Sequence, residues 1–96
     1  MTIEVQTVAQ CLTNAMDSVN LINSINTDAS AEPSVEGMTQ TEINAVVDKN
    51  VRHLETILAY DGSGEVQPNI VGSSSSKKTD CSNAITTGKA YIAANS

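Results

Sequence analysis

Phenylalanine and tryptophan are both missing from this chain, and its aromatic side chains are Tyr60 and Tyr91 alone. Large aromatic side chains each bury roughly 150–250 Å² in a protein core, so aliphatic residues, methionine and alanine must build the core here. A chain of this length forms one domain and buries about two thirds of its unfolded surface. We therefore expect a single domain over residues 1–96, of modest stability, that forms a homo-oligomer or multi-copy assembly or is stabilised by what it binds.

Positive charge is missing from the first half of the chain. Residues 1–48 contain no lysine or arginine, and all five basic residues lie from Lys49 onward. The acidic side chains of that half are Glu4, Asp17, Asp28, Glu32, Glu36, Glu42 and Asp48. With a net charge of −6, the protein would be repelled by nucleic acid and by anionic membranes, so we expect neither as a partner. The acidic half predicts binding to a basic protein surface, or else it only keeps a small protein soluble.

The residue types that build catalytic and metal sites are scarce. The sequence has one histidine, His53, and two cysteines, Cys11 and Cys81, far apart in the chain. Closely spaced zinc ligands are absent, and the carboxylates form neither a catalytic pair nor a calcium-binding loop. We predict buried thiols rather than a disulfide. We also predict no catalytic, cofactor-binding or metal-binding residue, no cofactor and no enzyme activity.

Long hydrophobic runs are absent too. No stretch approaches the roughly 18 apolar residues that a membrane span needs. The first residues include Glu4 and no basic side chain, which is unlike a secretory signal. We therefore expect a protein that carries no export signal and enters no membrane.

Three segments have the hydrophobic period of an α-helix. We predict helices at 3–25, 39–60 and 78–94, packed as an all-α, small three-helix bundle with two long loops. The expected core positions are Val5, Val8, Leu12, Ala15 or Met16, Val19, Ile22 and Ile25; Ile43, Val46, Val47, Asn50 or Val51, Leu54, Ile57 and Leu58; and Cys81, Ala84, Ile85, Gly88, Tyr91 and Ile92. The small residues at 84 and 88 predict a close helix contact, which would offset the cost of about 1 kcal/mol for a glycine inside a helix.

Local polar signals mark the second helix in particular. Thr39 and Glu42 have the spacing of a capping box, in which each side chain bonds the backbone N–H of the other residue. Asp48 and Arg52 are spaced to form an ion pair on one helix face. Asn50 falls on the apolar stripe, where a buried amide must find partners. We expect it to bond a carbonyl group of a loop.

The two predicted loops, 26–38 and 61–77, exceed the two to eight residues that usually join packed helices. We predict that both are contact surfaces for a partner. The candidate contact residues are Glu32 and Glu36 in the first loop and Val66, Ile70 and Val71 in the second. For the three apolar residues a second interpretation stays open, because an apolar patch in a loop can also fold back over the end of the core.

Two segments of the second half carry a resemblance to known proteins. The sequence NVRHLE (50–55), followed after a loop by NAITTGKAYI (83–92), resembles small accessory virion proteins of tailed bacteriophages, and of cyanophages especially. The resemblance implies a virion structural protein, foremost a capsid decoration or cement protein that binds the major capsid protein or another virion protein. It leaves open a subunit of the head-to-tail connection. An acidic inhibitor or adaptor of a host protein is the alternative from another class.

Overall fold

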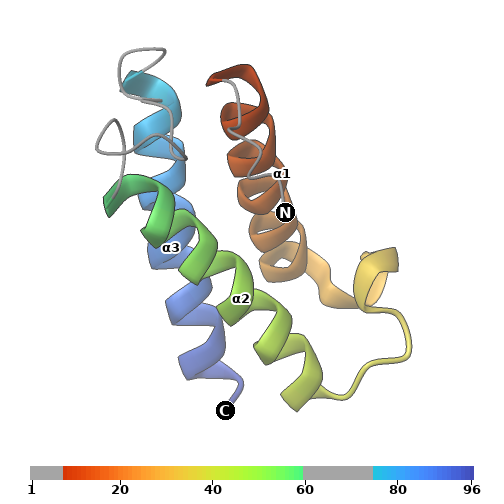
Figure 1. The fold of residues 1–96 in the computed structure, drawn as a ribbon. Coiled ribbons are helices and arrows are strands. Elements are labelled where there is room, and N and C mark those ends of the chain that lie inside the picture. The colour runs from red at the N-terminus through yellow and green to blue at the C-terminus, as the bar shows by residue number, and fades with distance from the viewer. Residues whose placement is uncertain (1–7, 60–74) are drawn as a thin grey trace, which may run out of the picture.

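The computed structural model describes residues 8–59 and 75–96. These contain three α-helices, α1 (Val8–Asp28), α2 (Gln40–Ala59) and α3 (Ser75–Ala94), and two short 3₁₀ helices, η1 (Ala29–Ala31) and η2 (Pro33–Val35). Each α-helix packs against both of the others. Helices α1 and α3 run in the same direction and α2 runs against both, so η1 and η2 lie at one end of the bundle (Figure 1). The predicted all-α three-helix bundle is confirmed, and the described ranges contain no strand.

Two helix ends differ from the sequence-based expectation. Helix α1 continues to Asp28, beyond the predicted end at residue 25, although residues 23–28 are mostly polar. Ile25 is 1% exposed, so the last turn of α1 is still packed on the core. Thr27 Oγ1 also donates to the carbonyl oxygen of Asn23 over 2.8 Å. Short polar side chains are weak stop signals, and residues 26–28 continue the helix although their side chains are exposed.

The start of α3 differs as well. The helix begins at Ser75, inside the serine run that we assigned to the second loop, and not at residue 78. Serine is favoured at helix N-termini as much as in loops, so the run marks a helix start. The predicted start of the first helix at residue 3 and nearly all of the second loop lie outside the described residues, whereas α2 ends at Ala59, one residue before the prediction.

The core lies between the three helices and is aliphatic. Its fully buried members in the described ranges are Ala15, Val19, Ile22, Ile25, Val35, Val47, Val51, Leu54, Ile57, Cys81 and Ala84. Met16, Ile43, Val46, Leu58, Ile85, Tyr91 and Ile92 pack partly buried against them. The predicted apolar faces of α2 and α3 are therefore confirmed, as is the burial of Cys81, while the Cys11 side chain lies outside the described part. No aromatic side chain reaches full burial in these ranges, as the composition predicts.

Gly88 packs closely against α2 and α1. A Cβ atom built on Gly88 would lie 2.4 Å from Val51 Cγ2, 3.2 Å from Val47 Cγ1 and 3.4 Å from Ile22 Cγ2. Separations under 3.0 Å essentially never occur for real Cβ atoms. The valine side chains of α2 therefore occupy the place that a side chain at position 88 would need. The close contact predicted from the small residues of α3 is confirmed.

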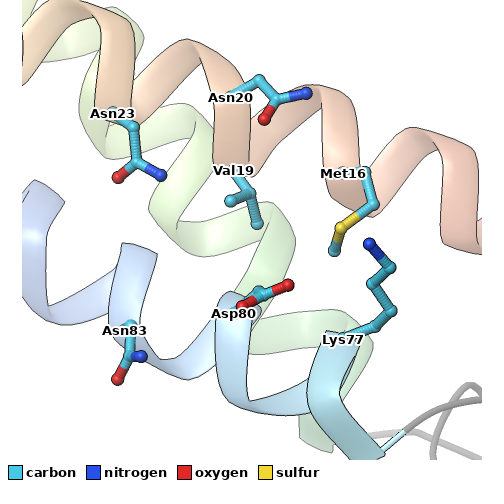
Figure 2. Close-up of a pocket in the computed structure, with 7 residues that line it drawn as sticks. All are labelled: Met16, Val19, Asn20, Asn23, Lys77, Asp80 and Asn83. Atoms are coloured by element: carbon cyan, nitrogen blue, oxygen red, sulfur yellow. The ribbon is translucent and has the colours of Figure 1, made fainter.

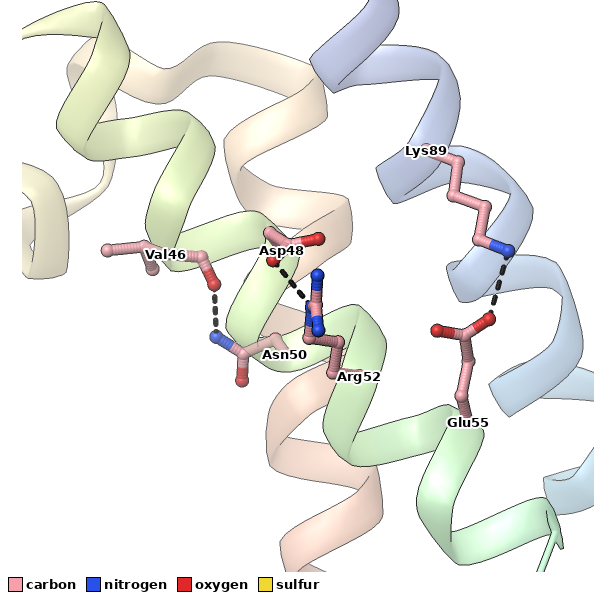
Figure 3. Close-up of polar contacts among 6 residues, drawn as sticks. All are labelled: Val46, Asp48, Asn50, Arg52, Glu55 and Lys89. Atoms are coloured by element: carbon pink, nitrogen blue, oxygen red, sulfur yellow. Dashed lines mark hydrogen bonds and ion pairs between the residues drawn. The ribbon is translucent and has the colours of Figure 1, made fainter.

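A polar pair is built into the interface between α1 and α2. Ser18 is 7% exposed, and its hydroxyl donates to Asn50 Oδ1 over 2.9 Å. The Asn50 amide nitrogen donates to the carbonyl oxygen of Val46 over 2.8 Å, as Figure 3 shows. The expectation that Asn50 bonds a loop carbonyl is wrong, because it faces α1 in the middle of α2 and its partners lie within reach on the two helices. Every buried polar atom of the pair is thereby satisfied.

Two ion pairs lie on the surface of α2 (Figure 3). Arg52 Nε lies 2.8 Å from Asp48 Oδ2, which confirms the predicted pair on one helix face. Lys89 Nζ lies 2.9 Å from Glu55 Oε2 and joins α3 to α2. Exposed pairs of this kind contribute about 0–1 kcal/mol each, so the apolar core carries most of the stability. Among the described helices, none is both long and apolar enough to cross a membrane.

Candidate partner-binding surface

The predicted contact residues fall on two connections, of which the structure describes one. Glu32 lies between η1 and η2, and Glu36 directly follows η2. Val66, Ile70 and Val71 lie outside the described residues, so their contact role stays a prediction. The surface that can be built from atoms is therefore the connection between α1 and α2, residues 29–39, which we call the acidic connection.

The acidic connection starts with a capped 3₁₀ turn. Asp28 caps η1: its Oδ1 accepts from Ser30 N over 3.1 Å and from Ser30 Oγ over 2.6 Å. Glu32 then caps η2, because its Oε1 accepts from Ser34 N over 3.2 Å. The other carboxylate oxygen of Glu32 accepts from Ser24 Oγ on α1 over 2.6 Å. One carboxylate thus holds the following turn and ties the connection back to the preceding helix.

The connection is also anchored in the core. Val35 is 3% exposed and belongs to the buried cluster. Gly37 then adopts a φ of +79°, a left-handed conformation that glycine takes without strain, and the chain turns into α2. There the Thr39 N–H donates to Glu42 Oε1 over 3.0 Å and the Glu42 N–H to Thr39 Oγ1 over 3.2 Å, so the predicted capping box is confirmed. The segment is a chain of short turns, where the sequence predicted a long loop.

The charged side chains of residues 28–42 are all acidic. They are Asp28, Glu32, Glu36 and Glu42, and no lysine or arginine precedes residue 49. The hydrogen bond from Ser24, followed by those from Ser34, lowers the pKa of Glu32 below its ordinary value of 4.5. The bonds from Thr39 lower the pKa of Glu42 in the same way. Both carboxylates are therefore ionised at neutral pH, and their hydrogen bonds fix where the charge lies.

A shallow hollow of about 520 Å³ adjoins Glu32 on the side of α1. Its lining residues are Asp17, Asn20, Leu21, Ser24, Glu32 and Ser34. Leu21 is partly buried, so the hollow combines an aliphatic surface with the carboxyl groups of Asp17 and Glu32. Sequence reasoning did not bring these two together, because the path of the connection depends on how η1 and η2 fold. The sequence did contain a signal for the α1 side of the hollow. The spacing of residues 17, 21 and 24 places them on one stripe of the helix.

Among the described residues, no group of three or more histidine, cysteine, aspartate or glutamate side chains is placed to hold a metal ion. His53 lies on the exposed side of α2, where partial loss of its water lowers its pKa below the ordinary value of 6.5. It is therefore mostly uncharged at neutral pH. The carboxylates of the acidic connection, in contrast, are ionised and held in place by hydrogen bonds. The acidic connection can therefore act as a fixed array of hydrogen-bond acceptors and negative charges.

Comparison of the chain with protein-family models, with curated proteins and with solved structures gives no match. The resemblance to phage virion proteins therefore stays a prediction from the two sequence segments.

Proposed function

We propose that this protein is a non-catalytic structural component of a tailed-phage virion, a decoration or cement protein that binds the capsid shell. The observation that carries the proposal is the acidic connection, in which Glu32 and Glu36 lie on capped turns directly after Asp28, with no basic side chain near them in sequence. Such a surface fits a basic patch on a partner protein. The resemblance of residues 50–55 and 83–92 to accessory virion proteins supports a capsid subunit as that partner.

The order within the acidic connection favours binding. A segment that is disordered before binding loses conformational freedom on contact, and that loss weakens the complex. Here the Glu32 bonds to Ser24 and Ser34 and the burial of Val35 hold the turns before any partner arrives. Complementary charge also raises the association rate and suppresses wrong partners. Binding should therefore weaken as salt concentration rises, because salt screens exposed charges beyond about 8–10 Å.

The composition supports a protein that works in contact with a larger assembly. The core contains no fully buried aromatic side chain in the described ranges, and the exposed ion pairs add little. Binding to a partner adds stability to a protein of modest intrinsic stability. A subunit of the head-to-tail connection would have the same properties. An acidic inhibitor of a host protein would also use the acidic connection, but it would not be part of the particle.

The test is the location and copy number of the protein in purified particles of the phage that encodes it. Particles are banded in a density gradient, and the protein is quantified by gel staining against the major capsid protein. A decoration protein should band with the particles in many copies, comparable to the number of capsid subunits or of their symmetric groups. A few copies per particle would instead indicate the head-to-tail connection. Absence from particles in which other head proteins are retained would refute a virion role and leave the inhibitor.

A further inference from the structure

The hollow of about 520 Å³ beside Glu32, which we call the Leu21 hollow, has charges of one sign only. Its charged lining residues are Asp17 on α1 and Glu32 between η1 and η2, and no basic side chain of the described residues lines it. Neither carboxylate forms an ion pair within the described ranges. A cation that enters the Leu21 hollow therefore meets two negative charges and no competing positive charge from the lining.

The pocket of about 410 Å³ between α1 and α3, which we call the α1–α3 pocket, has a different lining. Lys77 and Asp80 both line it from α3, so one charge of each sign is present. Figure 2 shows the Lys77 side chain extending from α3 toward Met16 of α1. A cation that approaches Asp80 is thus also repelled by Lys77. The α1–α3 pocket is therefore the internal comparison for the Leu21 hollow.

Leu21 gives the hollow an aliphatic floor. It is partly buried, and it lies four residues after Asp17 and three before Ser24, so the three side chains share one face of α1. Arginine and lysine have the matching form, an aliphatic stem that covers apolar surface and a charged end group. A neutral ligand would leave both carboxylates without a counter-charge, and an anion would be repelled.

Glu32 presents a carboxylate whose position is fixed. Its Oε1 accepts from Ser34 N over 3.2 Å and its Oε2 from Ser24 Oγ over 2.6 Å. A carboxylate has room for about four hydrogen bonds, so each oxygen can accept one more. An arginine guanidinium can bond both oxygens at once through two parallel N–H groups, whereas a lysine ammonium is a more strongly hydrated point charge. Because Ser24 and Ser34 already hold the carboxylate, little side-chain freedom is lost on binding.

We propose that the Leu21 hollow receives an arginine side chain of the partner protein. The methylene groups of the arginine lie on Leu21, its guanidinium bonds the Glu32 carboxylate, and Asp17 adds a second negative charge from α1. The inference rests on the proposed function for the identity of the partner, because it names the side chain by which a basic capsid surface is held beside the acidic connection. It also adds Asp17 and Leu21, which lie outside that connection, to the contact surface.

The first test is a titration of the isotope-labelled full-length protein, followed by nuclear magnetic resonance. The probe is N-acetyl-arginine methylamide at millimolar concentrations and constant ionic strength. Saturable shifts are expected for the Leu21 methyl signals and the Glu32 backbone amide signal. The citrulline compound of the same shape should bind at least about tenfold more weakly, because it lacks the charge. Equal affinity for the citrulline compound overturns the proposal, as do shifts centred on Asp80 or the lack of a saturable shift.

Variants separate this inference from the proposed function. Asp17→Asn should weaken probe binding by about two- to fivefold, the worth of one exposed charge contact. Asp80→Asn is the matched control, because Asp80 is an exposed helix carboxylate that lines the α1–α3 pocket. Both variants are then sedimented with capsids stripped of the protein, and weaker binding is expected for Asp17→Asn alone. Capsid binding that Asp17→Asn leaves unchanged refutes the arginine site and leaves the proposed function standing. Probe binding without capsid binding supports the arginine site and refutes the capsid as the partner.

Discussion

Replacing Gly88 by alanine should destabilise the protein, although the same change stabilises most helices. At an open helix position, alanine is favoured over glycine by about 1 kcal/mol. At position 88 the new methyl group would lie 2.4 Å from Val51 Cγ2, with Val47 Cγ1 at 3.2 Å and Ile22 Cγ2 at 3.4 Å closing two other sides. Valine has one strongly preferred side-chain rotamer in a helix, so Val51 cannot simply turn away. Either α3 moves outward or α2 adjusts.

The size of the effect follows from two opposing contributions. An extra methyl group in a well-packed core lowers the free energy of unfolding by about 1–3 kcal/mol. The helix preference of alanine raises it by about 1 kcal/mol. We expect a net loss of about 1 kcal/mol, which lowers the melting temperature by about 4–8 °C in a domain of this size. Val51→Ala alone should cost about 2 kcal/mol through lost burial and the cavity it leaves. In the double variant the new methyl group fills part of that cavity, so the two losses should not add.

Urea unfolding followed by far-ultraviolet circular dichroism measures these differences. Ala90→Gly is the matched control, because residue 90 is exposed in the same helix and reports the helix preference alone. It should cost about 1 kcal/mol. If Gly88→Ala is as stable as the wild type or more stable, the close packing of α3 on Val51 is wrong. Strict additivity in the double variant would contradict the same contact.

Three further predictions concern the polar contacts. Thr39→Ala should lower the free energy of unfolding by about 1 kcal/mol in the same urea assay, because the start of α2 loses its cap. Asn50→Leu should cost about 1–3 kcal/mol, since the buried Ser18 hydroxyl loses its acceptor; a stability equal to wild type would show that this pair is not formed. The pKa of Glu32 is lowered by folding, so its contribution to stability is present above about pH 4.5 and is lost as the pH falls below that value. Glu32→Gln should therefore flatten the decline of the melting temperature in acid, and an unchanged profile would mean that the Ser24 and Ser34 bonds are absent in solution.

Local patterns allowed most of the helical framework to be predicted from the sequence. The capping box needs only Thr39 and Glu42, three residues apart, and the core face of α2 needs only the helical period. The end of α1 was predicted three residues too early because residues 26–28 are polar, yet they continue the helix and Thr27 bonds back to the carbonyl oxygen of Asn23. The start of α3 was missed because serine is common both in loops and at helix starts.

The surfaces were harder to predict, because they depend on how the elements meet. Glu32 was a candidate contact residue by charge alone, and its bond to Ser24 depends on how η1 folds the chain back onto α1, which no local pattern shows. Val19 of α1 and Asp80 of α3 line one pocket although they are 61 positions apart, and only the parallel arrangement of α1 and α3 brings them together. The predicted partner of Asn50 was wrong for the same reason. Ser18 lies close to Asn50 only because α1 packs against α2, and that contact cannot be read from either helix alone.

The most direct test of the account measures whether the acidic connection binds the capsid. Purified protein is added to particles stripped of it, and bound protein is quantified after sedimentation over a range of salt concentrations. The variant Glu32→Gln/Glu36→Gln removes two charges from the acidic connection, and the control Asp48→Asn/Glu55→Gln removes two from the exposed ion pairs of α2. The account predicts saturable, salt-sensitive binding that the first variant loses and the control retains. Equal binding by both variants, or no binding by the wild type, would contradict it.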